Sequence, residues 1–177
     1  MRDLKYHEKK LLKKVNLTEW KTTNTTKEQL VTSKYYLHSR DEYVYYNRIV
    51  GMIRKLAESL SRLPPKDATR NFITKALLNK LYEIGIIDQK LLSECTKVTV
   101  SSICKRRLPM VLTYKKMIPN FKDADKFVQQ GHIVFGTKVC REPSVLIKRG
   151  MEDFIKWRED SKIKRKIDEY NGELDDF

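Results

Sequence analysis

The stretch Arg107–Gly150 concentrates the side chains of this chain that could do chemistry. It carries an Arg-Leu pair at Arg107, a Gly-His-Ile segment from Gly131 and a Pro-Ser pair at Pro143, and it reads as two basic helices followed by a tight β-hairpin. That layout places cationic side chains on one short, rigid face, and a folded double-stranded nucleic acid is the anion that suits such a face. Because no set of groups suited to bond-making chemistry lies nearby, we expect a binding protein without catalytic residues.

The candidate RNA ligands fall into a helix group and a hairpin group. A surface of this kind clamps RNA phosphates across a groove and reads shape more than sequence. We expect only part of the set to contact RNA, and local hydrogen bonding is the simpler role for the histidine. The helix group is Arg106, Arg107, Lys115, Lys116, Lys122 and Lys126, and the hairpin group is His132, Lys138, Arg141, Lys148 and Arg149.

Composition points to the same kind of partner. The chain has 177 residues, a formal net charge of +14 and 40% hydrophobic residues, which suits one compact domain with or without a helical extension. An excess of Lys and Arg this large suggests nucleic acid first and an anionic membrane second. No apolar run approaches the roughly 20 residues that span a bilayer, and the basic N-terminal segment has only a thin apolar face. We therefore expect no membrane partner.

The cysteines and histidines do not form a metal site. Cys95, Cys104 and Cys140 show no CxxC spacing, and His7 and His38 have no cysteine or carboxylate at metal-ligand spacing. We expect buried free thiols in a reducing compartment, with no metal and no cofactor.

Apolar spacing predicts a helical first part. Helices are expected over Leu4–Lys21 and from about Arg40 to Leu63, with a loop at Thr22–Thr26 between them. A third helix is capped by Asp67 and ended by Gly85.

The second part mixes helices and strands. A fourth helix is expected from Thr99 or Ser101 through Met117, and a fifth from Asn120 to Gly131. Short strands are then expected at Ile133, Phe135, Val139 and Val145–Ile147, whereas Met151–Trp157 fits either a strand or a short helix.

The fourth and fifth helices and the hairpin resemble the S-four RNA-binding domain, which is named for a small-subunit ribosomal protein. Asn120–Lys122 replaces the usual Ser-Arg or Ser-Lys, so Lys122 must supply the charge there. The usual Asn-Gly turn is Phe135-Gly136, and because Phe tolerates positive φ poorly, we expect a type II′ turn that starts at Gly136. The matching residues are Arg107-Leu108, Ala124, Gly131–Gly136, Val139, Pro143-Ser144 and Gly150.

Nearly the whole chain is also similar to a narrower family, the Imp-three family of S-four-domain proteins in the U-three (U3) small nucleolar ribonucleoprotein. The resemblance implies an α+β fold in which a helical N-terminal part precedes two helices packed on a small antiparallel β-sheet. It also implies three units: a helical region at 1–104, the S-four domain at 105–160 and a charged tail at 161–177. The resembling segments are Leu4–Val15, Glu19–Lys21, Tyr46–Ile49, Leu56-Ala57, Leu63–Pro65, Leu78–Tyr82, Lys97–Ser101, Ile103–Pro109, Met151–Phe154 and Ser161–Lys164.

The resemblance implies a non-catalytic ribosome-biogenesis factor of the nucleus and nucleolus. Members of the family bind U3 small nucleolar RNA and help it to pair with pre-ribosomal RNA in the small-subunit processome, beside Imp-four and Mpp-ten. A small-subunit ribosomal protein that binds rRNA directly is the alternative. An RNA-modifying enzyme is disfavoured, because the rest of the chain offers no Gly-rich phosphate loop and no Cys-His pair.

The aromatic residues and the basic run near the C-terminus each fit more than one role. The aromatic residues Trp20, Tyr35, Tyr36, Tyr43, Tyr45 and Tyr46 could stack on bases, but at helical spacing such residues more often lie in a core or a protein interface. The basic run Lys162–Lys166 fits an RNA contact, a nuclear-import signal or a solvated helix face.

Overall fold

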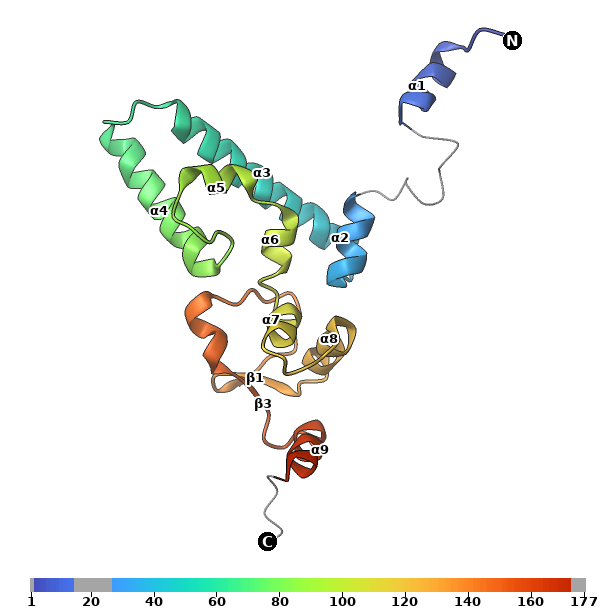
Figure 1. Cartoon of the computed structure of the whole chain (residues 1–177), viewed down its shortest axis with the longest axis vertical. Helices are drawn as coiled ribbons and strands as arrows, with labels where there is room; N and C mark the ends of the chain where they lie inside the picture. Colours follow the sequence, from blue (N-terminus) through green and yellow to red (C-terminus); the bar gives the residue numbers. More distant parts are fainter. Residues whose placement is uncertain (1, 15–26, 173–177) are drawn as a thin grey trace.

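The computed structural model describes residues 2–14 and 27–172 (Figure 1). The predicted loop at 22–26, Trp20, the second half of the predicted first helix and the acidic end of the chain lie outside these residues. The helices of the first part are α1 (Tyr6–Lys14), α2 (Lys27–Tyr35), α3 (Arg40–Arg62), α4 (Ala68–Ile84), α5 (Leu92–Lys97) and α6 (Val100–Cys104).

Side chains cap the starts of the two long helices, and a glycine caps the end of the second. Ser39 accepts a hydrogen bond from the Glu42 N–H at the start of α3, and Asp67 accepts one from the Thr69 N–H at the start of α4. Gly85 ends α4 with φ +84°, a conformation that costs glycine little because it has no Cβ. The predicted helices from Arg40 and from Asp67 are therefore confirmed, whereas α2 and α5 were not predicted.

The predicted fourth helix is wrong, because the structure divides it into α6 and α7 (Leu108–Tyr114). Arg107 is extended at the break, with φ −65° and ψ 146°. Pro109 explains the break: it has no N–H to donate, and its ring would clash with the carbonyl of Lys105 in a continuous helix. The proline is instead tolerated in the first turn of a new helix.

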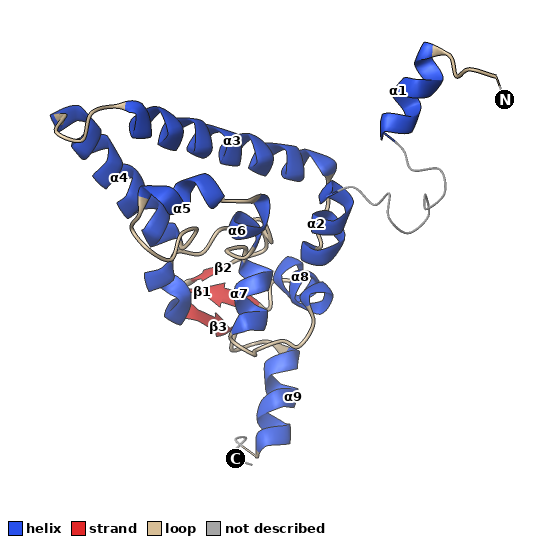
Figure 2. Ribbon diagram, turned by 45° about the horizontal axis from the view of Figure 1, so that its top comes forward, coloured by secondary structure: helices blue, strands red, loops and turns tan. Residues whose placement is uncertain are grey.

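Helix α8 (Phe121–Gln129) leads into a three-stranded antiparallel sheet with the order β2-β1-β3 (Figure 2). The strands are β1 (Ile133–Phe135), β2 (Lys138–Val139) and β3 (Ile155–Trp157). Gly136 has φ +61°, and Thr137 is not among the residues with positive φ, as expected for a type II′ turn.

The structure decides two predictions for the C-terminal part, at residues 145–147 and 151–157. The strand predicted at 145–147 is wrong, because only a single bridge joins Leu146 to Arg107 there. The pairing stays short because its partner, Arg107, lies in the brief link between α6, which ends at Cys104, and α7, which begins at Leu108. The segment left open at 151–157 forms both structures, since the 3₁₀ helix η1 (Arg149–Phe154) runs directly into β3.

The core consists of two hydrophobic clusters that meet at α7. The first lies among α2, α3, α4, α5 and α6 and includes Met110 of α7. The second lies between α7, α8 and the sheet and includes Leu108 and Leu112. The predicted α+β class, with helices followed by a small sheet of the S-four type, is confirmed. Among the described residues, no helix is long and apolar enough to span a membrane.

Candidate nucleic-acid interface

Arg107 joins the helical part to the S-four part from inside the protein. Its side chain is 1% exposed and forms an ion pair with Glu42 of α3 at 2.7 Å, while Nη1 also donates to the Tyr46 hydroxyl at 3.2 Å. Burial opposes the charge, but the bonds to Glu42 and Tyr46 outweigh it and raise the guanidinium pKa. Arg107 is therefore a buried cation that holds α7 against α3, and its charge is not directed to the surface.

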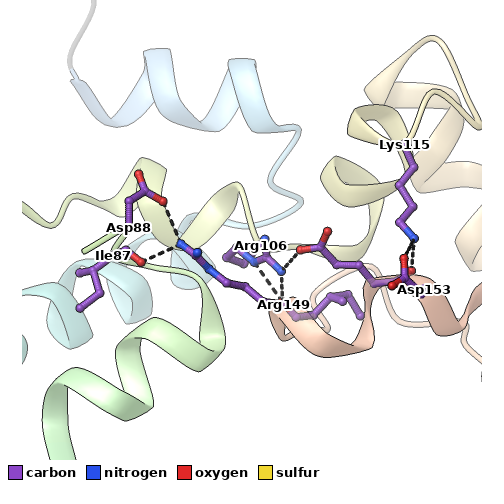
Figure 3. A network of polar contacts seen from close by, with 8 residues as sticks. Ile87, Asp88, Arg106, Lys115, Arg149 and Asp153 are labelled. Carbon is purple, nitrogen blue, oxygen red and sulfur yellow. Dashed lines mark hydrogen bonds and ion pairs between the residues drawn. The ribbon is translucent and has the colours of Figure 1, made fainter. Parts of the chain in front are cut away.

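Arg106 belongs to a second set of polar contacts, which we call the junction cluster: Asp88, Arg106, Lys115, Arg149, Glu152 and Asp153 (Figure 3). The Arg106 guanidinium donates to the Ile147 carbonyl at 3.0 and 2.7 Å and to Glu152 at 2.6 Å. Its stem lies against Gly85, where a Cβ would come within 2.9 Å of Nε. The planar fork of arginine suits these three simultaneous bonds.

Arg149 and Lys115 extend the junction cluster in opposite directions (Figure 3). Arg149 donates to the Ile87 carbonyl and to Asp88, both at 2.8 Å, and its guanidinium lies 4.5 Å from the centre of the Tyr82 ring. Lys115 donates to the Glu152 carbonyl and pairs with Asp153 at 3.1 Å. The cluster thus ties the end of α4 and the end of α7 to η1.

All residues of the junction cluster except Asp153 line a cleft of about 640 Å³ between the two parts of the molecule. Arg106, Lys115 and Arg149 face it together with Asp88 and Glu152, so the two carboxylates offset part of the positive charge there. Lys105 and Tyr114 also line the cleft, and both are exposed.

A third contact between the parts involves a buried acid that the sequence did not reveal. Asp125 of α8 is 2% exposed and lies 2.9 Å from the His38 ring, and Gln129 donates to Asp125 at 2.9 Å. Glu42, Tyr46 and His38 stand more than sixty positions from their partners in the chain. No spacing pattern in the sequence could have indicated these contacts.

His132 is half-buried and makes local contacts. Its Nδ1 lies 3.0 Å from the Ser161 hydroxyl, and its ring meets Phe127 edge-on. Its carbonyl accepts a hydrogen bond from the Arg158 N–H at 2.8 Å. These contacts join β1 to the segment after β3.

The other predicted ligands point into solvent. Within residues 2–14 and 27–172 their side chains form no hydrogen bond or ion pair, and all six are exposed. Arg141 also packs over Gly131, where its Nε would lie 3.3 Å from a Cβ. We call these six the exposed cations: Lys116, Lys122, Lys126, Lys138, Arg141 and Lys148.

The structure therefore divides the predicted ligands. Arg106, Arg107, Lys115 and Arg149 are engaged within the protein, His132 faces Ser161, and the exposed cations remain available to a polyanion. Because unpaired cations spread over α8, β2 and the loops that adjoin α7, β2 and η1 can approach several phosphates at once, the exposed cations form the better candidate interface. That they contact RNA stays a prediction.

Comparison with known proteins agrees with this fold. Residues 3–105 match the family described as ribosomal protein S4/S9 N-terminal domain. The "U3 small nucleolar ribonucleoprotein protein IMP3" of Saccharomyces cerevisiae is 44% identical, over 100% of this chain and 98% of the relative. Its Homo sapiens counterpart is 43% identical, over 100% and 97%. The "Small ribosomal subunit protein uS4" of Sulfolobus acidocaldarius is 30% identical, over 82% and 83%.

The fold and the matched family model define an S-four-type protein, a class of non-enzymatic proteins. Within that class the full-length similarity is decisive, and the chain belongs to the IMP3 family of U3 small nucleolar ribonucleoprotein proteins. The resemblance drawn from the sequence is thus confirmed.

Proposed function

We propose that this protein is a component of the U3 small nucleolar ribonucleoprotein that acts in ribosome biogenesis in the nucleolus. The observation that carries the proposal is the 44% identity, over the whole chain, to a yeast protein of that name. U3 small nucleolar RNA and pre-ribosomal RNA are the proposed ligands, and Mpp-ten and Imp-four type proteins of the small-subunit processome are the proposed protein partners.

The proposed mechanism is electrostatic. Two RNA strands repel each other through their phosphates, and a protein that neutralises phosphates on both strands reduces this repulsion. Binding can shift the pairing equilibrium only by the difference in affinity between paired and unpaired RNA. The exposed cations are suited to this role because, among the described residues, they form no ion pair within the protein. The proposed units are a helical region at 1–104, the S-four domain at 105–160 and a charged tail at 161–177.

An annealing assay tests the mechanism. A labelled fragment from the 5′ part of U3 RNA is mixed with a complementary pre-ribosomal RNA fragment, with and without the protein. We expect the protein to increase the paired fraction, and we expect Lys122→Glu combined with Lys126→Glu to remove most of this effect. The matched control is Lys75→Glu combined with Lys80→Glu on α4, where both lysines are also exposed. Equal effects of the two pairs would contradict the proposed surface.

Crosslinking in cells distinguishes the alternative, a ribosomal protein that binds rRNA directly. Recovery of U3 RNA together with the 5′ part of the pre-ribosomal transcript supports the proposal. Recovery of mature small-subunit rRNA alone, with the protein in translating ribosomes, would overturn it.

A further inference from the structure

Helix α9 (Lys162–Asn171) extends from the S-four domain with a strongly basic first half (Figures 1 and 2). Four of its first five residues are cations: Lys162, Lys164, Arg165 and Lys166. No residue of the helix is buried, and Ile163 and Ile167 are only half-buried. The helix therefore contributes little to the core.

The charges of α9 run against the helix dipole. An isolated helix gains from acidic side chains near its N-terminus and basic ones near its C-terminus. Here the cations occupy the N-terminal half, and Asp168 and Glu169 lie in the C-terminal half. Lys164 stands four residues before Asp168, yet no ion pair joins them among the residues described. This charge order does not serve helix stability, so an external anion is the better explanation of the basic half.

The start of α9 is fixed to the S-four domain. Ser161 is 2% exposed, and its hydroxyl accepts the Lys164 N–H at 3.4 Å while it lies 3.0 Å from Nδ1 of His132. The side chain of Arg141 packs against Gly131, the residue directly before His132. The first turn of α9 and one of the exposed cations therefore flank the same short segment of the hairpin.

From these observations we propose that α9 is a second RNA-binding element, which binds phosphates of the same RNA that lies on the exposed cations. The inference rests on the proposed function, since it names a further part of the same RNA-binding surface. Double-stranded RNA is the favoured occupant because it presents closely spaced phosphates along a rigid path. A membrane is disfavoured because two isoleucines form too narrow an apolar face. His132 and Ser161 act as positioning residues that set the direction of the helix.

Charge reversal on α9 tests the proposal in the full chain. The variant Lys162→Glu, Arg165→Glu and Lys166→Glu is compared with Lys55→Glu, Lys75→Glu and Lys80→Glu, which changes net charge equally on the exposed side of α3 and α4. Binding to a duplex RNA that spans both elements is measured at several salt concentrations. We expect the α9 variant to weaken binding about tenfold and to reduce the slope of log affinity against log salt by up to about three, one for each lost phosphate contact.

The outcomes separate the two proposals. If the unaltered protein binds RNA but the α9 variant matches the α3–α4 control, the inference about α9 is overturned and the exposed cations keep their role. If the unaltered protein does not bind RNA, the proposed function itself fails. If the α9 variant keeps full RNA affinity but loses capture of an acidic peptide, the helix serves a protein partner and the proposal is wrong.

A directional readout tests the positioning role of His132. A cleavage reagent attached through Tyr170→Cys, at a residue that is 92% exposed, cuts RNA near the far end of α9. We expect sharp cuts in the parent and in His132→Asn, whose side-chain oxygen can replace Nδ1 as a partner of Ser161, and diffuse cuts in His132→Ala. Identical cutting in all three proteins would show that this contact does not orient the helix.

Discussion

Arg106, Arg107 and Arg149 differ from Lys122, Lys126 and Lys138 in where their charge is directed. The arginines are engaged by Glu42, Glu152, Asp88 and backbone carbonyls between the two parts of the molecule. The lysines lie on α8 and β2 and face solvent. The comparison shows that a basic motif can contain two functions: the arginine fork suits several fixed acceptors at once, whereas an exposed ammonium stays free for phosphate.

The largest effect is expected at Arg107. Replacing it with alanine leaves Glu42 without its partner and removes the bond to Tyr46, so we expect the free energy of unfolding to fall by about 3 kcal/mol. Urea denaturation measures this change. The control is Arg48→Ala on the exposed side of α3, with an expected change within about 0.5 kcal/mol. A loss of RNA affinity without a loss of stability in Arg107→Ala would break the comparison.

Alkaline pH tests the same buried region. Burial raises the pKa of the Cys104 thiol to about 11, from 9.0. Below pH 9 the Cys104 thiol is protonated in both the folded and the unfolded state. Between pH 9 and 11 the thiol loses its proton in the unfolded state but keeps it in the folded state. Stability should therefore fall over this window, with a contribution of about 2 kcal/mol at pH 11.

Cys104→Ala provides the control for that prediction. The variant should show a shallower decrease between pH 9 and 11 in urea titrations, while Tyr46, whose pKa burial also raises, keeps its own contribution. An unchanged slope would show that Cys104 is not responsible.

Arg106→Lys separates charge from geometry in the junction cluster. Lysine keeps the charge but cannot bond the Ile147 carbonyl twice and Glu152 as well. We expect a loss of about 1–2 kcal/mol in thermal or urea unfolding. Lys105→Arg, next to it and exposed, should leave stability unchanged. Equal stability of Arg106→Lys and the parent protein would show that charge alone is sufficient.

Lys116→Gly should change stability and binding in opposite directions. Lys116 has φ 58° at the second position after α7, a conformation that strains a residue with a Cβ. Glycine should raise the free energy of unfolding by up to about 1 kcal/mol, while the loss of an exposed cation weakens RNA binding. Lys116→Ala removes the same charge and keeps the strain. If both variants have equal stability, the left-handed residue is not strained.

The smallest effect on stability is expected at Lys122 and Lys126. Because neither side chain has a partner in the described residues, alanine at both positions should change the unfolding free energy by less than about 0.5 kcal/mol. RNA affinity should nevertheless fall at low salt, as measured by titration. A larger loss of stability would show that these lysines belong with the arginines.

Local signals predicted the long helices well. Asp67 and Gly85, the caps predicted from the sequence, cap the two ends of α4 through bonds to neighbouring residues, and the apolar spacing that predicted α3 also lies within a few positions. The break at Pro109 was also present in the sequence, since proline excludes the continuous helix that apolar spacing favoured. The strand predicted at 145–147 failed for another reason: strand formation depends on a partner, and apolar spacing does not supply one.

The sequence by itself determined the basic character of the protein, the capped helices, the hairpin turn at Gly136 and the family to which the chain belongs. These depend on composition, local backbone preferences and residue identity at fixed spacing. Only the tertiary structure decided which basic residues are available. Arg107 and Lys122 look equivalent along the chain, but one meets Glu42, sixty-five positions away, and the other meets solvent. Burial and pairing are properties of the folded arrangement, because they depend on contacts between residues that are distant in sequence.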